Sequence, residues 1–221
     1  MSADDDPVIR PYESRDREAV RRVCFETGYM GDPIAWQWRD EESFADLFTS
    51  YYTDHEPESA IVVEMGGRVV GYLLGCRDTR HAGNPVAPLG RHVVKRGLFF
   101  RPGTAGVLWR SVRDIGVDAI RCDLPAASDY DPRWPAHLHI DFLAEARGRG
   151  VGRTMMTRWL DSLRSDGVAG CHLGTWAENE GAISFFEAMG FQRRGRPVPM
   201  PGMRDRRGNR HHSQAMTIEF A

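Results

Sequence analysis

A glycine- and arginine-rich turn is the part of this 221-residue sequence best suited to binding a ligand. Its seven residues are Arg147, Gly148, Arg149, Gly150, Val151, Gly152 and Arg153. A glycine-rich turn that leads into a helix surrounds an anion with unpaired backbone N–H groups and the positive end of the helix dipole. The glycines let the backbone approach a bulky group, and the arginines neutralise its charge. The pattern therefore predicts a site for a phosphate or pyrophosphate.

Three ionisable residues precede the turn at alternate positions. They are His137, His139 and Asp141. Side chains two apart in a strand point to the same face, so these three groups could form a proton relay. A histidine on a central strand is also commonly a hydrogen-bonded core residue, and both interpretations stay open at this point.

A strand and a helix must position these groups. Alternation over 137–143 predicts a strand, and apolar residues at helical spacing from Val151 to Leu163 predict a helix that ends at Asp166-Gly167. A dinucleotide-binding Rossmann unit is a poor alternative, because its glycines directly follow the first strand of a parallel βαβ unit. Here three residues separate the strand from the turn, and the element is central in the chain.

The rest of the chain alternates between predicted strands and helices. Strands are predicted at 8–12, 59–64, 68–76, 171–176, 191–193 and 215–220, and helices after Ser14 and at 41–52 and 179–189. Gly66-Gly67 predicts a hairpin turn between the second and third strands. Residues 77–135 are proline-rich and less regular, with helices predicted near 90–99 and 106–117. We interpret them as a helical insertion over the active face, within a single domain of residues 8–221.

Composition excludes several classes of function. The chain is 41% hydrophobic and 27% charged with a formal charge of −2, which is typical of one globular domain and favours neither nucleic acid nor anionic membrane. The basic run at 204–212 lacks the aromatic residues that stack on bases, so it predicts a solvated hairpin loop. No window approaches ~18 consecutive apolar residues, so no membrane span is expected.

The cysteines and the N-terminus predict a location. The four cysteines are Cys24, Cys76, Cys122 and Cys171, with no Cys-x-x-Cys pair. Residues 1–7 are interpreted as a disordered acidic tail, because they carry aspartates and not the basic and apolar segments of a secretory leader. We expect reduced thiols, a cytoplasmic protein, no metal ion, and a monomer or homodimer.

Two motifs together resemble the GCN5-related N-acetyltransferases (the GNAT superfamily). The first is Arg147-x-x-Gly150-x-Gly152 at a strand-to-helix turn. The second, about 30 residues later, is Asn179-x-x-Ala182 leading to Phe186-x-x-x-Gly190-Phe191. The resemblance implies an α/β fold with a central mixed seven-stranded sheet flanked by helices, and acetyl-coenzyme A (acetyl-CoA) as donor to an amine acceptor.

The resemblance also implies roles for individual residues. The turn residues Arg147, Gly148, Arg149, Gly150, Val151, Gly152 and Arg153 would hold the pyrophosphate. Backbone groups of Ile140, Phe142 and Leu143 would bind the pantetheine arm as an added strand does. Asn179 would approach that arm from the end of the next strand. Phe186 would also contact the cofactor. It stands where many family members carry a tyrosine acid, and phenylalanine cannot donate a proton.

The resemblance implies direct attack by the amine on the acetyl group in a ternary complex. Asp141, His139 and His137 are the candidate bases, in a pattern similar to the two-histidine strand of arylalkylamine N-acetyltransferases, with one residue fewer before Arg147. The leaving thiolate would take its proton from water, from Cys171 or from a tyrosine of the insertion, or would leave unassisted. The alternative is a non-catalytic module that binds acyl-CoA or a peptide.

A subfamily resemblance and a predicted acceptor pocket complete the expectations. Gly71-Tyr72-Leu73-Leu74-Gly75, the later Asp78-Thr79-Arg80 and Tyr51-Tyr52 are similar to the acetyltransferase-like C-terminal domain of O-GlcNAcases and its stand-alone bacterial relatives. The acceptor pocket is expected between the 32–38 loop, the insertion and the 200–210 loop. These segments offer Trp36, Trp38, Tyr130 and Trp134 and no concentrated charge.

Overall fold

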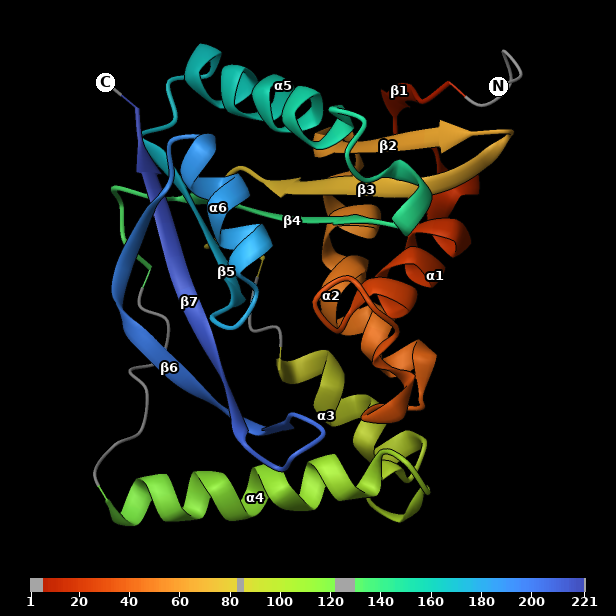
Figure 1. The fold of residues 1–221 in the computed structure, drawn as a ribbon, viewed down its shortest axis with the longest axis vertical. Coiled ribbons are helices and arrows are strands. Elements are labelled where there is room, and N and C mark those ends of the chain that lie inside the picture. Colours follow the sequence, from red (N-terminus) through yellow and green to blue (C-terminus); the bar gives the residue numbers. More distant parts are fainter. Residues whose placement is uncertain (1–5, 83–85, 122–129, 221) are drawn as a thin grey trace.

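The sheet has seven strands, as predicted. A computed structural model describes residues 6–82, 86–121 and 130–220. Across these residues the strand order is β1-β2-β3-β4-β5-β7-β6 (Figure 1). The strands are β1 (Val8–Pro11), β2 (Ala60–Met65), β3 (Arg68–Cys76), β4 (Ala136–Phe142), β5 (Gly170–Trp176), β6 (Gln192–Arg204) and β7 (Arg210–Glu219). Only β4 and β5 pair in parallel, so the sheet is mixed.

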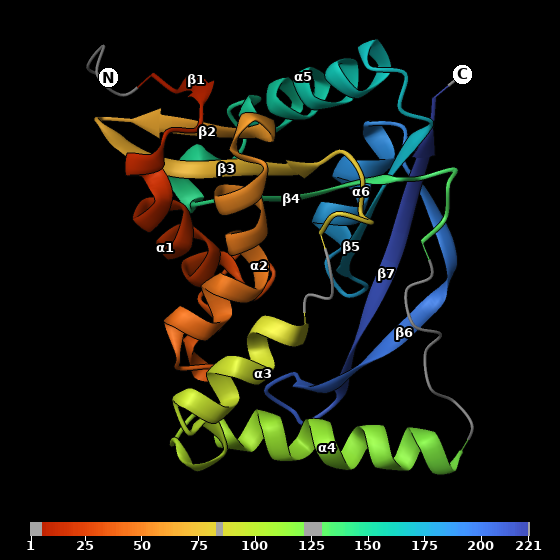
Figure 2. The ribbon, with the colours of Figure 1, turned by 180° about the vertical axis from the view of Figure 1, so that it is seen from behind.

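Helices cover both faces of the sheet. They are α1 (Arg17–Thr27), α2 (Glu41–His55), α3 (Val86–Lys95), α4 (Ala105–Ile120), α5 (Val151–Ser165) and α6 (Glu180–Ala188). Helices α5 and α6 pack on one face and α1 and α2 on the other (Figures 1 and 2). No helix in these ranges is long and apolar enough to cross a bilayer.

The sheet splits in its middle. β4 and β5 pair only at Ala136 with Cys171 and at His137 with His172. Beyond these pairs the strands diverge, and Figure 1 shows β5 running steeply away from β4. β4 stays paired with β3 from His137 to Phe142, which is all of the strand except Ala136. The edge of β4 that faces β5 is therefore open over most of the strand.

The last two strands are longer than predicted. Residues 194–204, which lie outside the predicted strands and are rich in proline, glycine and arginine, form most of β6, which runs to Arg204 and pairs with β7. β6 is an edge strand, where a missing backbone N–H costs no ladder bond, and the pairing shifts register between Arg194 and Val198. The β2–β3 hairpin agrees with the prediction, with positive φ at Gly66 and Gly67.

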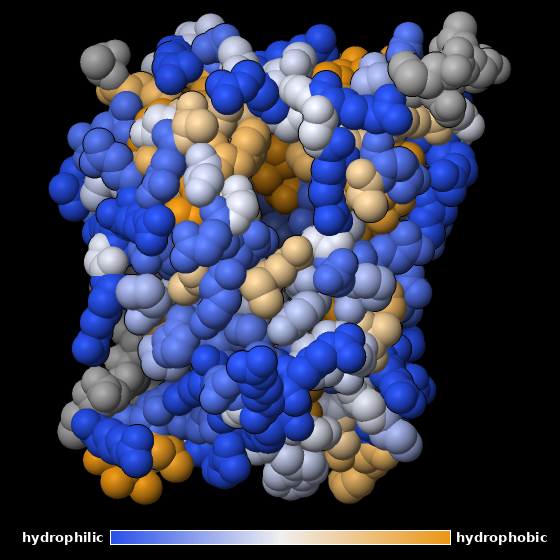
Figure 3. Space-filling view, in the orientation of Figure 1, coloured by the Kyte–Doolittle hydropathy of each residue, from blue (hydrophilic) through white to orange (hydrophobic). Residues whose placement is uncertain are grey.

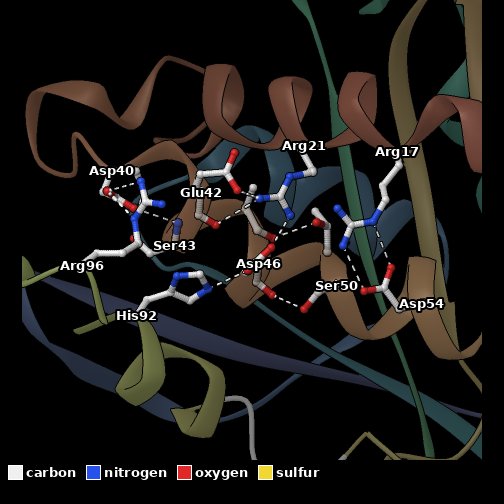
Figure 4. Close-up of polar contacts among 12 residues, drawn as sticks. Arg17, Arg21, Asp40, Glu42, Ser43, Asp46, Ser50, Asp54, His92 and Arg96 are labelled. Atoms are coloured by element: carbon white, nitrogen blue, oxygen red, sulfur yellow. Dashed lines mark hydrogen bonds and ion pairs between the residues drawn. The ribbon is translucent and has the colours of Figure 1, made fainter. Parts of the chain in front are cut away.

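Ion pairs fasten the first helix of the insertion to the body. The ring of His92 on α3 lies 2.6 Å from a carboxylate oxygen of Asp46 on α2, which also pairs with Arg21 on α1. Arg96 reaches Asp40, whose carboxylate caps α2, at 2.9 Å. Figure 4 shows these groups meeting between the three helices.

The second helix of the insertion is fastened to the β6–β7 hairpin. Asp114 on α4 pairs with Arg204 at 2.5 Å, and Asp118 pairs with Arg210 at 2.6 Å. Both aspartates are buried. The basic run predicted to be a solvated loop is therefore solvated only at its tip, because its two ends neutralise acids of α4.

Candidate active site

A cavity of about 500 Å³ lies where β4 and β5 separate. It is lined from both faces of the sheet, by Asn179, Ala182 and Phe186 at α6 and by Phe44, Leu47 and Phe48 of α2. The floor includes residues 138–141 of β4. Figure 3 shows a hollow with an apolar floor on the front face, between the halves of the molecule that carry α6 and α1–α2. The separation of the strands thus opens a passage through the sheet.

Asp141 and His139 meet in this cavity, as their alternate positions predicted. Both project toward α1 and α2, where Tyr72 of β3 lies beneath them. The Tyr72 hydroxyl donates to Asp141 Oδ2 at 2.8 Å and lies 3.1 Å from His139 Nδ1. His139 Nε2 is 3.6 Å from Asp141 Oδ2, and Phe48 stacks on the imidazole with ring centroids 5.5 Å apart.

Burial raises the pKa of Asp141. The favourable charge of His139 and the hydrogen bond from Tyr72 act in the opposite direction but do not cancel it. The carboxyl side chain keeps 22% exposure and lines the cavity. A carboxylate with a raised pKa is a stronger base than an ordinary one, which suits proton abstraction at the cavity.

Cys24 completes a group of three polar side chains on this wall. Its sulfur, a ring nitrogen of His139 and a carboxylate oxygen of Asp141 all lie within 4.8 Å of one another. Cys24 is fully buried, and burial raises the pKa of its thiol, so the thiol stays protonated at neutral pH. The expectation that the protein binds no metal stays a prediction.

His137 shares the face of β4 with the other two residues but does not line the cavity. It sits at the paired end of the strand, where its ring stacks on His172 at 5.6 Å and its Nδ1 lies 3.2 Å from the Thr79 hydroxyl. Burial lowers the pKa of His137 to about 3, so it is neutral. Of the three residues considered for a proton relay, His139 and Asp141 line the cavity and His137 does not, because the strands separate only after His137.

The predicted anion site lies beside the cavity, at the start of α5. Gly148 and Gly150 have φ of +72° and +77°, and Gly150 caps the helix. A Cβ added at either glycine would have no neighbour within 4 Å. The first turn of α5 also presents N–H groups that have no partner within the helix. The turn therefore offers open space, backbone donors and positive φ that favours glycine.

The three arginines of the turn are exposed and bend back onto the chain. Arg147 donates to the carbonyl of Phe142 at 2.9 Å and to that of Gly31 in the loop after α1. Arg149 donates to the Glu145 carbonyl at 2.9 Å, and Arg153 lies near Met189 of the segment after α6. Arg147 thus joins the turn to a loop that lines the cavity.

Of the three β4 positions predicted to bind the pantetheine arm, two direct their backbone N–H groups into the gap between β4 and β5. The Leu143 N–H donates to the Val70 carbonyl on β3, and its carbonyl accepts from the backbone of Ala146. Alternate residues of an antiparallel ladder point to opposite sides, so the N–H groups of Ile140 and Phe142 face the gap. The Leu143 N–H already has its partner, so it is not available to a ligand.

The second motif also reaches the cavity. The side-chain oxygen of Asn179 caps α6 by accepting from the Ala182 N–H at 3.1 Å, and Asn179 lines the cavity. Phe186 is buried at 6% exposure, lines the cavity and packs edge-on against Phe185 and Phe191. These contacts explain the apolar residue at this position, and they provide no proton donor.

The cavity wall differs from the predicted acceptor pocket. Trp38, Met200 and Met203 line it, but no residue of α3 or α4 and none of Trp36, Tyr130 and Trp134 is among the lining residues that the structure describes. Sequence reasoning missed Cys24, Thr27, Phe48 and Tyr72 as site residues. Tyr72 is recognised as a neighbour of Asp141 from the register of β3 against β4, which pairs the two residues. The sequence does not reveal that register, because the insertion separates the two strands in the chain.

Comparison with known proteins agrees with this geometry. Residues 125–191, which contain both motifs, match the model of the Acetyltransferase (GNAT) family. The crystal structure of SsHAT aligns with 98% of this chain and 99% of its own, at 27% identity and a TM-score of 0.65. The chain is thus similar to the GNAT superfamily in the segment that carries both motifs and in its overall fold. The mixed sheet with a divided centre is accordingly a GNAT-like fold.

Two other comparisons are weaker, one in the length that it covers and the other in sequence identity. An uncharacterized N-acetyltransferase of Methanocaldococcus jannaschii is 30% identical over 77 residues, which are 34% of this chain and 34% of that protein. The structure of yncA from Salmonella typhimurium with its cofactor acetyl-CoA covers 96% of this chain and 93% of its own at 15% identity, with a TM-score of 0.55. At that identity the likeness shows the fold.

Proposed function

We propose that the protein is an acetyl-CoA-dependent N-acetyltransferase that acts on an amine of a small molecule or peptide. One observation carries the proposal: a glycine turn at a helix N-terminus, a strand edge with free N–H groups and a half-buried carboxylate border the same gap in the sheet. The first two features suit a phosphorylated, extended donor, and the third suits the removal of a proton from an amine.

Acetyl-CoA fits the residues present. The open space at Gly148 and Gly150 would receive the pyrophosphate, and the donors of the first turn of α5 would bind it. The N–H groups of Ile140 and Phe142 would bind the pantetheine arm, and Asn179, which lines the cavity, would contact it. Arg149 and Arg153 are exposed and add positive charge near the turn.

Asp141 is the proposed base. It accepts a proton from the acceptor amine as the nitrogen attacks the acetyl carbon, and the Tyr72 hydroxyl and His139 hold the carboxylate in place. A backbone N–H of β4 that faces the gap can stabilise the oxyanion. Bound acetyl-CoA supplies the acetyl group, which the amine receives by direct attack in a ternary complex.

The residues considered as acids for the leaving thiolate do not fit that role in the structure. Phe186 cannot donate, and Cys171 and Tyr130 do not line the cavity. Burial also raises the pKa of Cys171 to about 12. The hydroxyls of Thr175 and Ser213 do line the cavity, and they can relay a proton from water to the thiolate.

Phe186 also supports a second candidate function. A non-catalytic module that binds acyl-CoA or a peptide would keep the glycine turn and need no acid. The resemblance to the acetyltransferase-like domain of O-GlcNAcases belongs to this candidate as well, because domains of that kind include ones without cofactor binding. The open glycine turn favours the enzyme.

Turnover separates the two functions. The protein is mixed with acetyl-CoA and a panel of primary amines and peptides, and released coenzyme A is measured with a thiol reagent. We expect release that depends on the amine and falls at least 100-fold in Asp141→Asn, since general base catalysis contributes roughly 10²–10⁴-fold. Asp161→Asn, an exposed change on α5, is the matched control and should keep full activity. Release at the spontaneous rate with every acceptor would favour the binding module.

A further inference from the structure

We infer that the acceptor is a primary amine on a compact apolar body, preferably aromatic, with no second charged group. The inference rests on the proposed function and names the class of its unknown substrate. It comes from the part of the cavity that faces α1 and α2, which the donor site does not use. The inference depends on three properties of that wall, namely its low charge, its apolar surface and the hydrogen bonds that its polar groups already make within the chain.

The wall carries almost no charge. Asp141 is the only carboxylate among the described lining residues, and these residues include no lysine or arginine. One ammonium group is therefore matched by one carboxylate. A second ammonium, as in a polyamine, or a carboxylate, as in an amino acid, would be buried without a partner, which costs several kcal/mol.

The rest of the wall is apolar and largely aromatic. Phe44 and Phe48 of α2 lie with ring centroids 4.8 Å apart, and Phe48 stacks on His139. Trp38, Met200 and Met203 extend the same surface from the loop before α2 and from β6. An apolar acceptor gains about 25 cal/mol for each Å² of surface that it buries here, and an aromatic one can also stack on the rings.

Three polar groups on or beneath this wall are already bonded within the chain. The Trp38 indole N–H donates to Ser43 Oγ at 3.0 Å, and the Thr27 hydroxyl donates to the Val23 carbonyl at 2.6 Å. The Tyr72 hydroxyl beneath the wall donates to Asp141. An acceptor with many hydroxyls, such as an amino sugar, would therefore lose its hydrogen bonds to water and recover few of them.

A pair of acceptors that differ by one charge tests the inference. 2-Phenylethylamine and phenylalanine share the aromatic body and the amine, but phenylalanine adds a carboxylate. We expect kcat/KM to be at least 100-fold higher for 2-phenylethylamine, and higher than for spermidine or glucosamine by a similar factor. A preference for phenylalanine, spermidine or glucosamine would overturn the inference.

Binding measured without turnover separates this inference from the proposed function. Calorimetry of each amine against protein saturated with coenzyme A reports the acceptor class even if no acetyl is transferred. Binding of 2-phenylethylamine at least 100-fold tighter than that of phenylalanine, with no turnover, would support the class and overturn the enzyme. Equal binding, or none, would overturn the class while donor binding and turnover still test the enzyme.

A designed change of specificity makes the test sharper. Met203→Arg places a cation on the apolar wall, so it should narrow the preference for 2-phenylethylamine over phenylalanine at least tenfold. Met203→Leu keeps the wall apolar and is the matched control. An unchanged ratio in Met203→Arg, in a variant that still binds acetyl-CoA, would show that this wall does not contact the acceptor and would overturn the inference.

Discussion

Replacing Gly150 with glutamate tests the donor site directly. Gly150 is the last residue of the glycine turn before α5 and caps that helix, with φ of +77° and no neighbouring atom within 4 Å of an added Cβ. The new side chain therefore meets open space, and its carboxylate lies where the pyrophosphate is proposed to bind. We expect the variant to fold and to lose acetyl-CoA binding.

The size of each effect follows from the geometry. A non-glycine residue in the left-handed conformation lowers the free energy of unfolding by about 1–2 kcal/mol. This is a minor part of a typical free energy of unfolding of about 5–15 kcal/mol. For a chain of this length the melting temperature should fall by roughly 2–8 °C. Two like charges 4 Å apart repel by about 1 kcal/mol in water and about 4 kcal/mol near a protein surface. Adding steric exclusion, we expect Kd to rise on the order of 100-fold.

Calorimetry with acetyl-CoA and thermal unfolding measure the two effects separately. Gly167→Glu is the matched control, because Gly167 lies at the other end of α5 with φ of +70° and the same open surroundings. It should show a similar loss of stability and normal affinity. Undiminished affinity in Gly150→Glu would refute the assignment of the turn to pyrophosphate.

Three further predictions concern the base, the insertion and the arginine beside the turn. Because burial raises the pKa of Asp141 and the base must be deprotonated, kcat/KM should rise with pH through that pKa, and this limb of the pH profile should vanish in Asp141→Asn. Burial opposes ionisation of Asp114, but hydrogen bonds from Gly202 and Arg204 lower its pKa to about 2. The lowered pKa stabilises the fold by about 2 kcal/mol above pH ~4, and this stabilisation is lost toward pH ~2. In urea unfolding, Asp114→Asn should therefore be less stable than the wild type at about pH 7, and the two should become similar in acid. Arg147→Ala should speed hydrogen exchange of the loop after α1, which the guanidinium holds, and unchanged exchange would show that this contact does not order the loop.

Local sequence patterns predict the elements around the donor site well. The hairpin from β2 to β3, the strand β4 and the helix α5 with its glycine turn all agree with the structure to within a few residues. Each depends on signals close in the chain, namely alternation, helical spacing and glycines at positive φ. The alternation of His139 and Asp141 likewise places both on one wall of the cavity, because side-chain direction is a local property of a strand.

Features that depend on distant partners were not predictable in the same way. The prolines of β6 argue against a strand in the sequence, because a strand tolerates them only at the edge of a sheet. No local pattern reveals that β6 is an edge strand. The ends of the basic run pair with Asp114 and Asp118, about 90 residues earlier, so their burial follows from tertiary contacts alone. The exclusion of His137 from the cavity depends on where β4 and β5 stop pairing, which is again a long-range property.

The insertion shapes the cavity although none of its described residues lines it. α3 is tied to α2 through Asp46 and His92, and α4 is tied to β7 through Asp118 and Arg210. α2 and the β6–β7 hairpin both line the cavity, and α3 and α4 are consecutive in the chain. The insertion therefore acts as a brace beneath the gap, visible at the bottom of Figures 1 and 2. Because packed interfaces resist small displacements, we propose that this brace limits how far α2 and the β6–β7 hairpin can separate, and so limits the size of amine that can reach the proposed base.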